Sequence, residues 1–202
     1  MSGAFSLGDE EAAADPYEQF RRWLETARGA VAGAETMVLA TATPDGCPSA
    51  RAVLLRGLDE AGLVFFTDTR SRKGAELAAN PRGAVVFVWT ALERQVRVEG
   101  PVAAVTAEEA DAYFASRPRG HRLAAWISYQ SQPVPGRSTL EAAMARAAAE
   151  HGEAVPRPPW WDGYRLSPSE WEFWQGRENR VHDRVRYREA GVDGWRRERL
   201  SP

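Results

Sequence analysis

Cationic and proton-exchanging side chains gather in the stretch from Glu172 to Arg184, EFWQGRENRVHDR. Successive side chains of a strand point to opposite faces, so Arg180, His182 and Arg184 would share one face if this stretch is extended. Such a face is suited to binding an anion, and a histidine can exchange a proton near neutral pH. A solvated edge strand whose charges discourage aggregation shows the same pattern. The stretch alone leaves both interpretations open.

Two shorter cationic clusters lie in the N-terminal half of the chain. Arg51 and Arg56 flank the apolar run of a predicted strand, RAVLLR, although charged ends are common on strands. Ser71, Arg72 and Lys73 open a predicted short helix, where backbone N–H groups, the helix dipole and two cations can together hold a phosphate. An exposed basic helix start explains this second cluster equally well.

Other polar groups are suited to a heterocycle or to a second anion. Gln95 lies on a predicted strand between apolar residues, where its amide offers a donor and an acceptor to a heterocycle or is satisfied within the core. Tyr113 and Arg117 lie four residues apart near a helix end, so both can reach one anionic group. An amphipathic helix with a surface arginine is the alternative.

Known catalytic and metal-binding patterns are missing from the sequence. The three histidines and the single cysteine, Cys47, lack zinc-like spacing, and there is neither a Gly-rich phosphate loop nor a nucleophile elbow. Cys47 lies beside a turn and is better interpreted as a structural or incidental thiol. We therefore expect no metal site, and we expect any chemistry to come from an organic cofactor held by Arg, Lys, Gln and Trp side chains.

The elements that must position these groups are mainly strands. Helices are predicted to begin at Asp15, Ser71, Thr106 and Ser138, the last two from capping boxes, and 117–132 is expected to be less regular. Alternation and turn signals predict strands over 37–43, 50–58, 63–67, 84–89, 95–105, 164–166 continuing into 171–174, 181–188 and 195–200, with a bulge or bend at Gly100. Antiparallel strands interrupted by a few helices predict a barrel-type α+β or mainly β domain.

The length and charge of the chain narrow its class further. A chain of 202 residues suits one domain, so we expect a flexible leader over 1–14 and a single domain over 15–202. A net charge of -2 argues against nucleic acid as the main partner. The sequence shows no apolar run of membrane-spanning length and no signal-peptide pattern, so a cytoplasmic protein without a membrane partner is expected.

Taken in order, seven segments resemble the pyridoxine (pyridoxamine) 5'-phosphate oxidase family: RAVLLR, FFTDTRSRKGAELAANP, ERQVRVEG, YFASRPRG, YQSQ, EFWQGRENRVHDR and RERLSP. The match extends from about Asp15 to the C-terminus. The resemblance implies an FMN-binding split β-barrel that works as a homodimer, with two flavins at the subunit interface. It also implies hydride removal from the 4'-carbon of pyridoxamine or pyridoxine 5'-phosphate, reoxidation of the flavin by O2, and release of pyridoxal 5'-phosphate and H2O2.

The resemblance assigns roles to individual residues as well. The implied cofactor-binding set comprises Arg51, Arg72 and Lys73 for the phosphate, Val53, Leu54, Phe66 and Thr67 beside it, and Gln95, Gln130, Ser131, Trp174 and Arg184 for the ring and ribityl parts, some from the partner chain. The implied substrate-binding set comprises Arg56, Tyr113, Arg117 and His121 for the phosphate, with Arg180 and His182 over the pyridine ring. Arg180 and His182 are the candidate catalytic residues.

Two departures from the family pattern affect the expected substrate. The family has Lys where this chain has Arg56, and usually Ser where it has His121. A planar guanidinium differs in reach from an ammonium, and a histidine is bulkier than a serine and changes charge with pH. An FMN-dependent oxidase of a different substrate, such as a phenazine-biosynthesis intermediate, therefore remains an alternative. A non-catalytic flavin or pyridoxal phosphate carrier is a third, with less need for Arg180 and His182 together.

Overall fold

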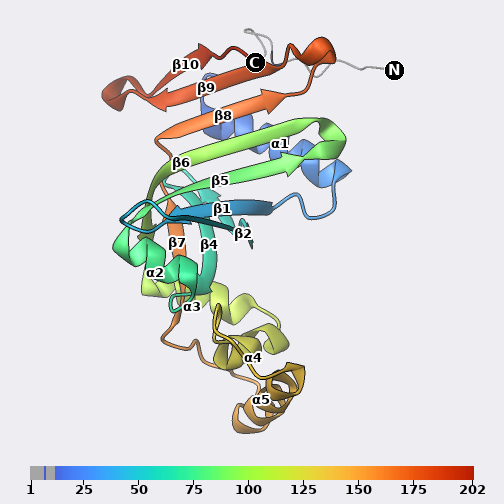
Figure 1. Ribbon diagram of the computed structural model, residues 1–202, viewed down its shortest axis with the longest axis vertical. Coiled ribbons are helices and arrows are strands. Elements are labelled where there is room, and N and C mark those ends of the chain that lie inside the picture. The colour runs from blue at the N-terminus through green and yellow to red at the C-terminus, as the bar shows by residue number, and fades with distance from the viewer. Residues whose placement is uncertain (1–6, 8–11) are drawn as a thin grey trace.

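The computed structural model describes Leu7 and residues 12–202 (Figure 1). The predicted flexible leader therefore lies mostly outside the described residues. The α-helices are α1 (Pro16–Ala30), α2 (Arg72–Ala79), α3 (Ala107–Ser116), α4 (Arg119–Ile127) and α5 (Arg137–Glu150). The strands are β1 (Thr36–Ala42), β2 (Pro48–Leu54), β3 (Gly57–Asp59), β4 (Gly62–Asp68), β5 (Arg82–Trp89), β6 (Arg94–Ala104), β7 (Trp161–Leu166), β8 (Glu170–Gln175), β9 (Asp183–Glu189) and β10 (Trp195–Arg199).

One long strand, β6, is shared by the two arms of a curled antiparallel sheet. The main arm runs in the order β10-β9-β8-β6-β5-β1-β2, and β7, β4 and β3 form the second arm. The first half of β6 pairs with β8, and its last residues pair with β7. A Cβ atom on Gly100 would lie 1.9 Å from the Ser167 carbonyl oxygen, so only glycine fits where β6 changes partner. This arrangement confirms the predicted mainly β architecture.

Helix α1 covers one face of the main arm and supplies much of its core (Figure 1). The Asp15 carboxylate accepts a hydrogen bond from the Tyr17 N–H at 2.9 Å, which confirms the predicted helix start. Phe20 is fully buried, with its ring centroid 4.9 Å from that of Phe87 and 5.3 Å from that of Trp171. The predicted apolar stripe of this helix is therefore packing.

Two predicted strands are each divided in the structure. The prediction of one strand over 50–58 is wrong, because the chain leaves β1 after Leu54 and joins β4. There the Leu55 N–H donates to the Glu35 carbonyl, and the Arg56 N–H donates to the Val64 carbonyl at 2.8 Å. The prediction that 164–166 continue into 171–174 is also wrong, since β7 and β8 pair with different halves of β6.

The helix predictions are partly confirmed. Ser71 and Thr106 cap α2 and α3 through their hydroxyl oxygens, as predicted. The prediction of a capping box at Ser138 is wrong, because α5 begins at Arg137 and the Glu141 side chain binds Arg137 instead. The segment 117–132, which was predicted to be less regular, contains the helix α4 over Arg119–Ile127, so the prediction missed this helix. No helix in the described part of the chain is long and apolar enough to cross a membrane.

The described residues before α1 pack against the C-terminal strands. Leu7, Ala12 and Ala13 are buried. The Tyr187 hydroxyl donates to the Ala13 carbonyl at 2.7 Å, and Arg197 donates to the Ala12 carbonyl at 2.6 Å. The two ends of the described chain therefore lie together at the β9–β10 edge of the sheet (Figure 1).

Candidate active site

A cavity of about 550 Å³ lies where β2, β4, α2, α3 and α4 meet. Three consecutive residues of β2 line the cavity. Because β2 is the last strand of the main arm, one of its edges faces the cavity, as such a lining requires. The backbone groups of such an edge are available to a ligand. Most of the predicted site residues come together here: Val53, Leu54, Arg56, Phe66, Thr67, Lys73, Tyr113, Arg117, His121 and Gln130.

Lys73 places a nearly buried ammonium group on the cavity wall. Its side chain is only 9 % exposed, and Nζ donates to Thr67 Oγ1 at 2.8 Å, Ser71 Oγ at 3.0 Å and Gln130 Oε1 at 2.8 Å. Burial and the nearby positive charge of Arg51 lower the pKa of Lys73 to about 8, although Asp68 opposes them. An anion in the cavity would favour the charged form. The cluster of Thr67, Lys73 and Gln130 is therefore suited to a phosphate.

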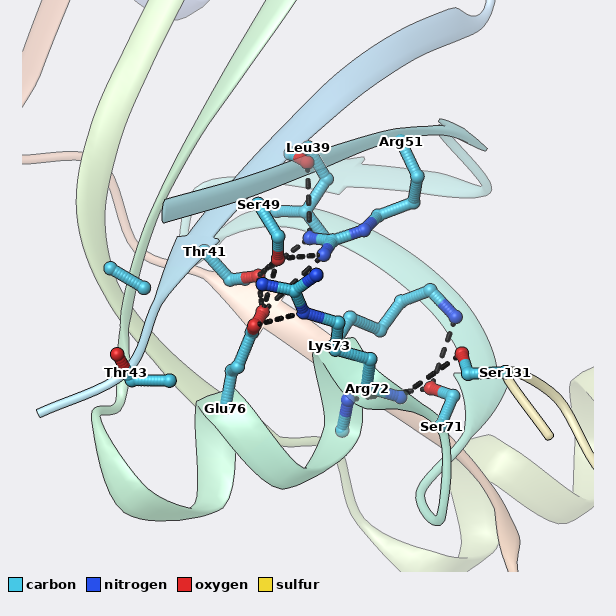
Figure 2. A network of polar contacts seen from close by, with 12 residues as sticks. Leu39, Thr41, Thr43, Ser49, Arg51, Ser71, Arg72, Lys73, Glu76 and Ser131 are labelled. Carbon is cyan, nitrogen blue, oxygen red and sulfur yellow. Dashed lines mark hydrogen bonds and ion pairs between the residues drawn. The ribbon is translucent and has the colours of Figure 1, made fainter. Parts of the chain in front are cut away.

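Arg51 and Arg72, predicted to act with Lys73, converge on a carboxylate that the sequence analysis missed (Figure 2). Glu76 Oε1 accepts from Arg72 Nε at 2.8 Å, and Glu76 Oε2 lies 3.3 Å from Arg51 Nη2. The Arg72 backbone N–H donates to Ser131 Oγ at 3.2 Å, which places that predicted residue at the start of α2. The four-residue spacing of Arg72 and Glu76 on a helix was a signal for this pair.

A stack of aromatic rings forms another wall of the cavity. The Phe66 ring lies 4.0 Å from the Tyr113 ring and 5.2 Å from the Trp161 ring, at small interplanar angles. The Arg117 guanidinium lies 4.7 Å over the Trp161 ring. Its Nη1 is buried and has no hydrogen-bond partner among the described residues, and burial lowers the pKa of Arg117. Buried donors are rarely left unpaired, so a ligand acceptor would satisfy this nitrogen.

The two departures from the family pattern lie in this same cavity. Arg56 and His121 line it together with Tyr113 and Arg117. The positive charge of Arg56 acts on the Arg117 guanidinium. The cavity thus carries more cationic groups than a neutral ligand requires, and a phosphate group would balance them.

Two further predicted cofactor residues line a second cavity of about 370 Å³ on the main arm of the sheet. Gln95 and Trp174 contribute to its wall. Gln95 lies opposite Trp174 across β6 and β8, and Trp174 lies opposite Arg184 across β8 and β9. The His182 ring centroid lies 4.6 Å from that of Trp174. Within one chain, the predicted site residues therefore form two separate groups.

The stretch that holds Arg180, His182 and Arg184 is not one extended strand, so the condition for a shared strand face is not met. A 3₁₀ turn over Glu178–Arg180 interrupts the stretch, with Arg180 at φ 60°, and β9 begins only at Asp183. The Arg177 backbone N–H donates to His182 Nδ1 at 3.1 Å, so a neutral His182 carries its proton on Nε2. Arg184 Nε donates to the buried Glu172 carboxylate at 2.7 Å.

A curled antiparallel half-barrel with such a cavity at its edge strand has the architecture of the FMN-binding split β-barrels. A pyridoxamine 5'-phosphate oxidase-related, FMN-binding protein of Nostoc punctiforme PCC 73102 shares the fold, with a TM-score of 0.77 and 19% identity over 94% of this chain and all of that one. A pyridoxamine 5'-phosphate oxidase family model matches residues 24–151, and a pyridoxine 5'-phosphate oxidase C-terminal dimerisation region model matches residues 161–202. The chain belongs to the pyridoxamine 5'-phosphate oxidase family, as the motifs predicted.

Two curated relatives and one solved structure resemble the chain over nearly its full length. The pyridoxine/pyridoxamine 5'-phosphate oxidase of Rubrobacter xylanophilus is 54% identical over 97% of this chain and 91% of that protein. The protein of the same name from Bordetella pertussis is 53% identical over 97% of this chain and 93% of that protein. PhzG of Burkholderia lata 383, solved in complex with tetrahydrophenazine-1-carboxylic acid, is 32% identical with a TM-score of 0.91 over 98% of this chain and 99% of that one.

Proposed function

We propose that this protein is an FMN-dependent oxidase that converts pyridoxamine or pyridoxine 5'-phosphate to pyridoxal 5'-phosphate, with O2 as electron acceptor and H2O2 as released product. With the amine substrate, one water is also consumed and ammonia is released. The observation that carries the proposal is the cavity in which an aromatic stack and several cationic groups meet, with a buried Arg117 nitrogen left without a partner. Membership of the family supports it.

The donor set around the start of α2 fits the phosphate of FMN. Arg51, Arg72 and Lys73 bring three cations near the first turn of the helix, where backbone N–H groups also favour an anion (Figure 2). Phe66 and Thr67 line the same cavity, and the β2 edge at Val53 and Leu54 offers backbone groups to the rest of the cofactor. Bound FMN supplies the hydride acceptor, while the protein binds and orients the reactants.

A second group of cationic and polar side chains in the same cavity fits the substrate phosphate. Tyr113, Arg117 and His121 belong to α3, α4 and the junction between them, and Arg56 adds a further guanidinium. Charge-assisted hydrogen bonds from these groups would fix the phosphate end and exclude water from it. The substrate ring would then lie at a set position relative to the cofactor, which is the main protein contribution in such a reaction.

We infer that a second copy of the chain completes the site. Residues opposite each other on antiparallel strands share a face, so Leu54, Val38 and Val88 lie on the face that carries Gln95 and Trp174. Val38 and Leu54 are each 41% exposed and Val88 is 53% exposed. An apolar sheet face of this kind fits an interface, and the matched dimerisation region supports a homodimer.

In this dimer, the partner would bring the second group of site residues to the cavity. Gln95, Trp174 and Arg184 would address the ring and ribityl parts of FMN, as would Gln130 and Ser131 from the first chain. Arg180 and His182 would face the substrate ring. With its proton on Nε2, neutral His182 donates a hydrogen bond at that atom, which suits it to orienting the substrate.

The test is to purify the protein, record its visible spectrum, and follow H2O2 and pyridoxal 5'-phosphate after adding pyridoxamine 5'-phosphate under air. We expect a yellow protein that forms both products in equal amounts. A yellow protein that forms neither product with pyridoxamine or pyridoxine 5'-phosphate would contradict the substrate assignment. A colourless protein that binds no added FMN would contradict the cofactor assignment.

A second candidate is an FMN-dependent oxidase acting on a phenazine-biosynthesis intermediate. The similarity to the PhzG complex and the presence of Arg56 and His121 in the cavity favour it. A dihydro- or tetrahydrophenazine carboxylic acid added to the same assay distinguishes the two. Tight binding of pyridoxal 5'-phosphate to the flavin-loaded protein would count against this candidate.

A further inference from the structure

We propose that Glu76 is the positioning residue of the flavin phosphate site, where it holds Arg51 and Arg72 side by side and sets the charge that they present. The proposal rests on the proposed FMN function. Figure 2 shows both guanidinium groups against the Glu76 carboxylate, one from β2 and one from α2. Glu76 would act on the ligand through these two arginines.

Four groups from three elements converge on this carboxylate. Glu76 is 4 % exposed, and its Oε2 accepts hydrogen bonds from the Thr41 and Ser49 hydroxyls, each at 2.5 Å. The same two hydroxyls accept from the Arg51 guanidinium, which also donates to the Leu39 carbonyl at 3.2 Å. Arg51 is thus held in one orientation by a network that has Glu76 at its centre.

Arg72 is held differently and stays open to a ligand. It binds Glu76 through Nε, and its side chain remains 56% exposed. The backbone N–H of Arg72 belongs to the first turn of α2, where an anion is favoured. The bond from Arg72 Nε to Glu76 directs the Arg72 guanidinium to the same region as Arg51. It also restricts the side chain before a ligand binds, so less conformational entropy is lost on binding.

The charge of the cluster matches a phosphate monoester. Two guanidinium groups bind the Glu76 carboxylate, the Lys73 ammonium lies close enough to Arg51 for their charges to interact, and the nearby Asp68 is paired with Arg70 at 2.8 Å. The cluster therefore has an excess of two positive charges when Lys73 is protonated. A phosphate monoester carries about -1.5 to -2 at pH 7. Without the carboxylate, three cations would repel one another before any ligand arrives.

Flavin affinity measures this role directly. Flavin-free protein is titrated with FMN and, separately, with riboflavin, which lacks the phosphate, and binding is followed by quenching of flavin fluorescence. In Glu76→Gln, an NH2 donor group replaces one of the two carboxylate oxygens. The single amide oxygen that remains cannot accept hydrogen bonds from both arginines and both hydroxyls. We expect the Kd for FMN to rise at least about tenfold, with little change for riboflavin.

Glu172→Gln is the matched control. Glu172 is also 4 % exposed and also binds two arginines, Arg97 and Arg184, but it lies on β8, away from α2. The control is expected to leave the ratio of FMN to riboflavin affinity at the wild-type value. Glu76→Asp keeps the charge on a shorter stem and is expected to give an intermediate ratio, which provides a second readout if the glutamine variant folds poorly.

The outcomes separate this inference from the function on which it rests. If Glu76→Gln keeps the wild-type ratio, or weakens both flavins equally, Glu76 has a structural role and the inference is wrong while the FMN assignment stands. If the wild-type protein itself binds riboflavin as tightly as FMN, the phosphate assignment of the site fails, and the inference fails with it.

Discussion

The protonation state of Lys73 contributes to the charge of the cavity, and it changes around pH 8. Its pKa of about 8 lies below the usual value of 10.5, because burial and the charge of Arg51 disfavour the ammonium form. The unfolded chain binds more protons than the folded one between these two values. The contribution of Lys73 to the stability of the flavin-free protein therefore rises with pH from about 8 to 10.5.

Flavin binding should show the opposite dependence on pH. A phosphate dianion favours the charged Lys73, so above pH 8 binding requires uptake of a proton. We expect the apparent affinity for FMN to fall as pH rises from 7.5 to 9.5, by up to about tenfold per pH unit. The second pKa of a phosphate monoester is near 6 and does not contribute in this range. Fluorescence titrations across this range measure the effect.

Lys73→Met is the control for this pH dependence. It keeps a long side chain without a titrating group, so its FMN affinity is expected to be weaker and nearly constant from pH 7.5 to 9.5. A decrease as steep as that of the wild type would assign the titration to another residue.

At the residue scale, motif order predicted which side chains gather around the cavity, including Lys73, Tyr113 and Arg117. It did not predict Glu76, because that role depends on a hairpin register that places Thr41 opposite Ser49. The tautomer of His182 also depends on a turn that local composition does not reveal. Contacts within one motif were predictable, whereas contacts between elements were not.

Among the elements, one very close backbone approach lies where β6 changes partner. Gly100→Ala would place a methyl group 1.9 Å from the Ser167 carbonyl oxygen, so the strand or the loop must move. We expect a loss of roughly 2–3 kcal/mol in the free energy of unfolding, measured by urea denaturation.

Gly120→Ala is the matched control for this substitution. Gly120 lies in α4, and its added Cβ atom would meet nothing within 4 Å. Alanine favours a helix over glycine by about 0.5–1 kcal/mol, so this variant is expected to be as stable as the wild type or more so. Equal stability of the two variants would contradict the close approach at Gly100.

Element boundaries were predictable where a side chain marks them. Asp15, Ser71 and Thr106 cap their helices through side-chain oxygens, and each helix was predicted. Helix α4 follows Pro118, which has no side-chain cap, and its second residue is Gly120. The division of 50–58 into two strands was not predictable, since hydrogen bonds to Glu35 and Val64 cause it.

For the whole molecule, the exposed apolar face is expected to pair two chains. Val38→Asp places a charge at the centre of that face, on a residue that lines neither cavity described above. We expect the solution mass to fall from two chains to one and FMN affinity to fall with it, because in the proposed dimer the partner supplies part of the flavin site. Light scattering after gel filtration and flavin titration measure the two effects.

Leu140→Asp provides the control for this interface. Leu140 is 37% exposed on α5, which lies outside the matched dimerisation region and away from the main arm of the sheet (Figure 1). This variant is expected to remain dimeric and to bind FMN normally. A monomeric Val38→Asp protein with wild-type FMN affinity would show that one chain holds the whole flavin site.

The resemblance implied that some of the cofactor residues come from the partner chain, but the order of motifs did not show which ones. The fold shows the grouping, because it places Gln95 and Trp174 in a different cavity from Lys73 and Arg117. The order of motifs indicates which residues match the family pattern, but the sheet topology determines which of these residues lie close together within one chain.

The sharing of β6 between two arms also constrains how the chain is made. During synthesis the chain emerges N-terminal end first, and β7, which lies between β4 and β6, becomes available only after residue 166. Until then the facing edges of β4 and β6 lack their partner, and β8 is also missing from the other half of β6. Unpaired strand edges are prone to wrong association. The ribosome-bound chain therefore depends on residues 161–175 to close the sheet, and it is expected to be prone to wrong association until that segment has emerged.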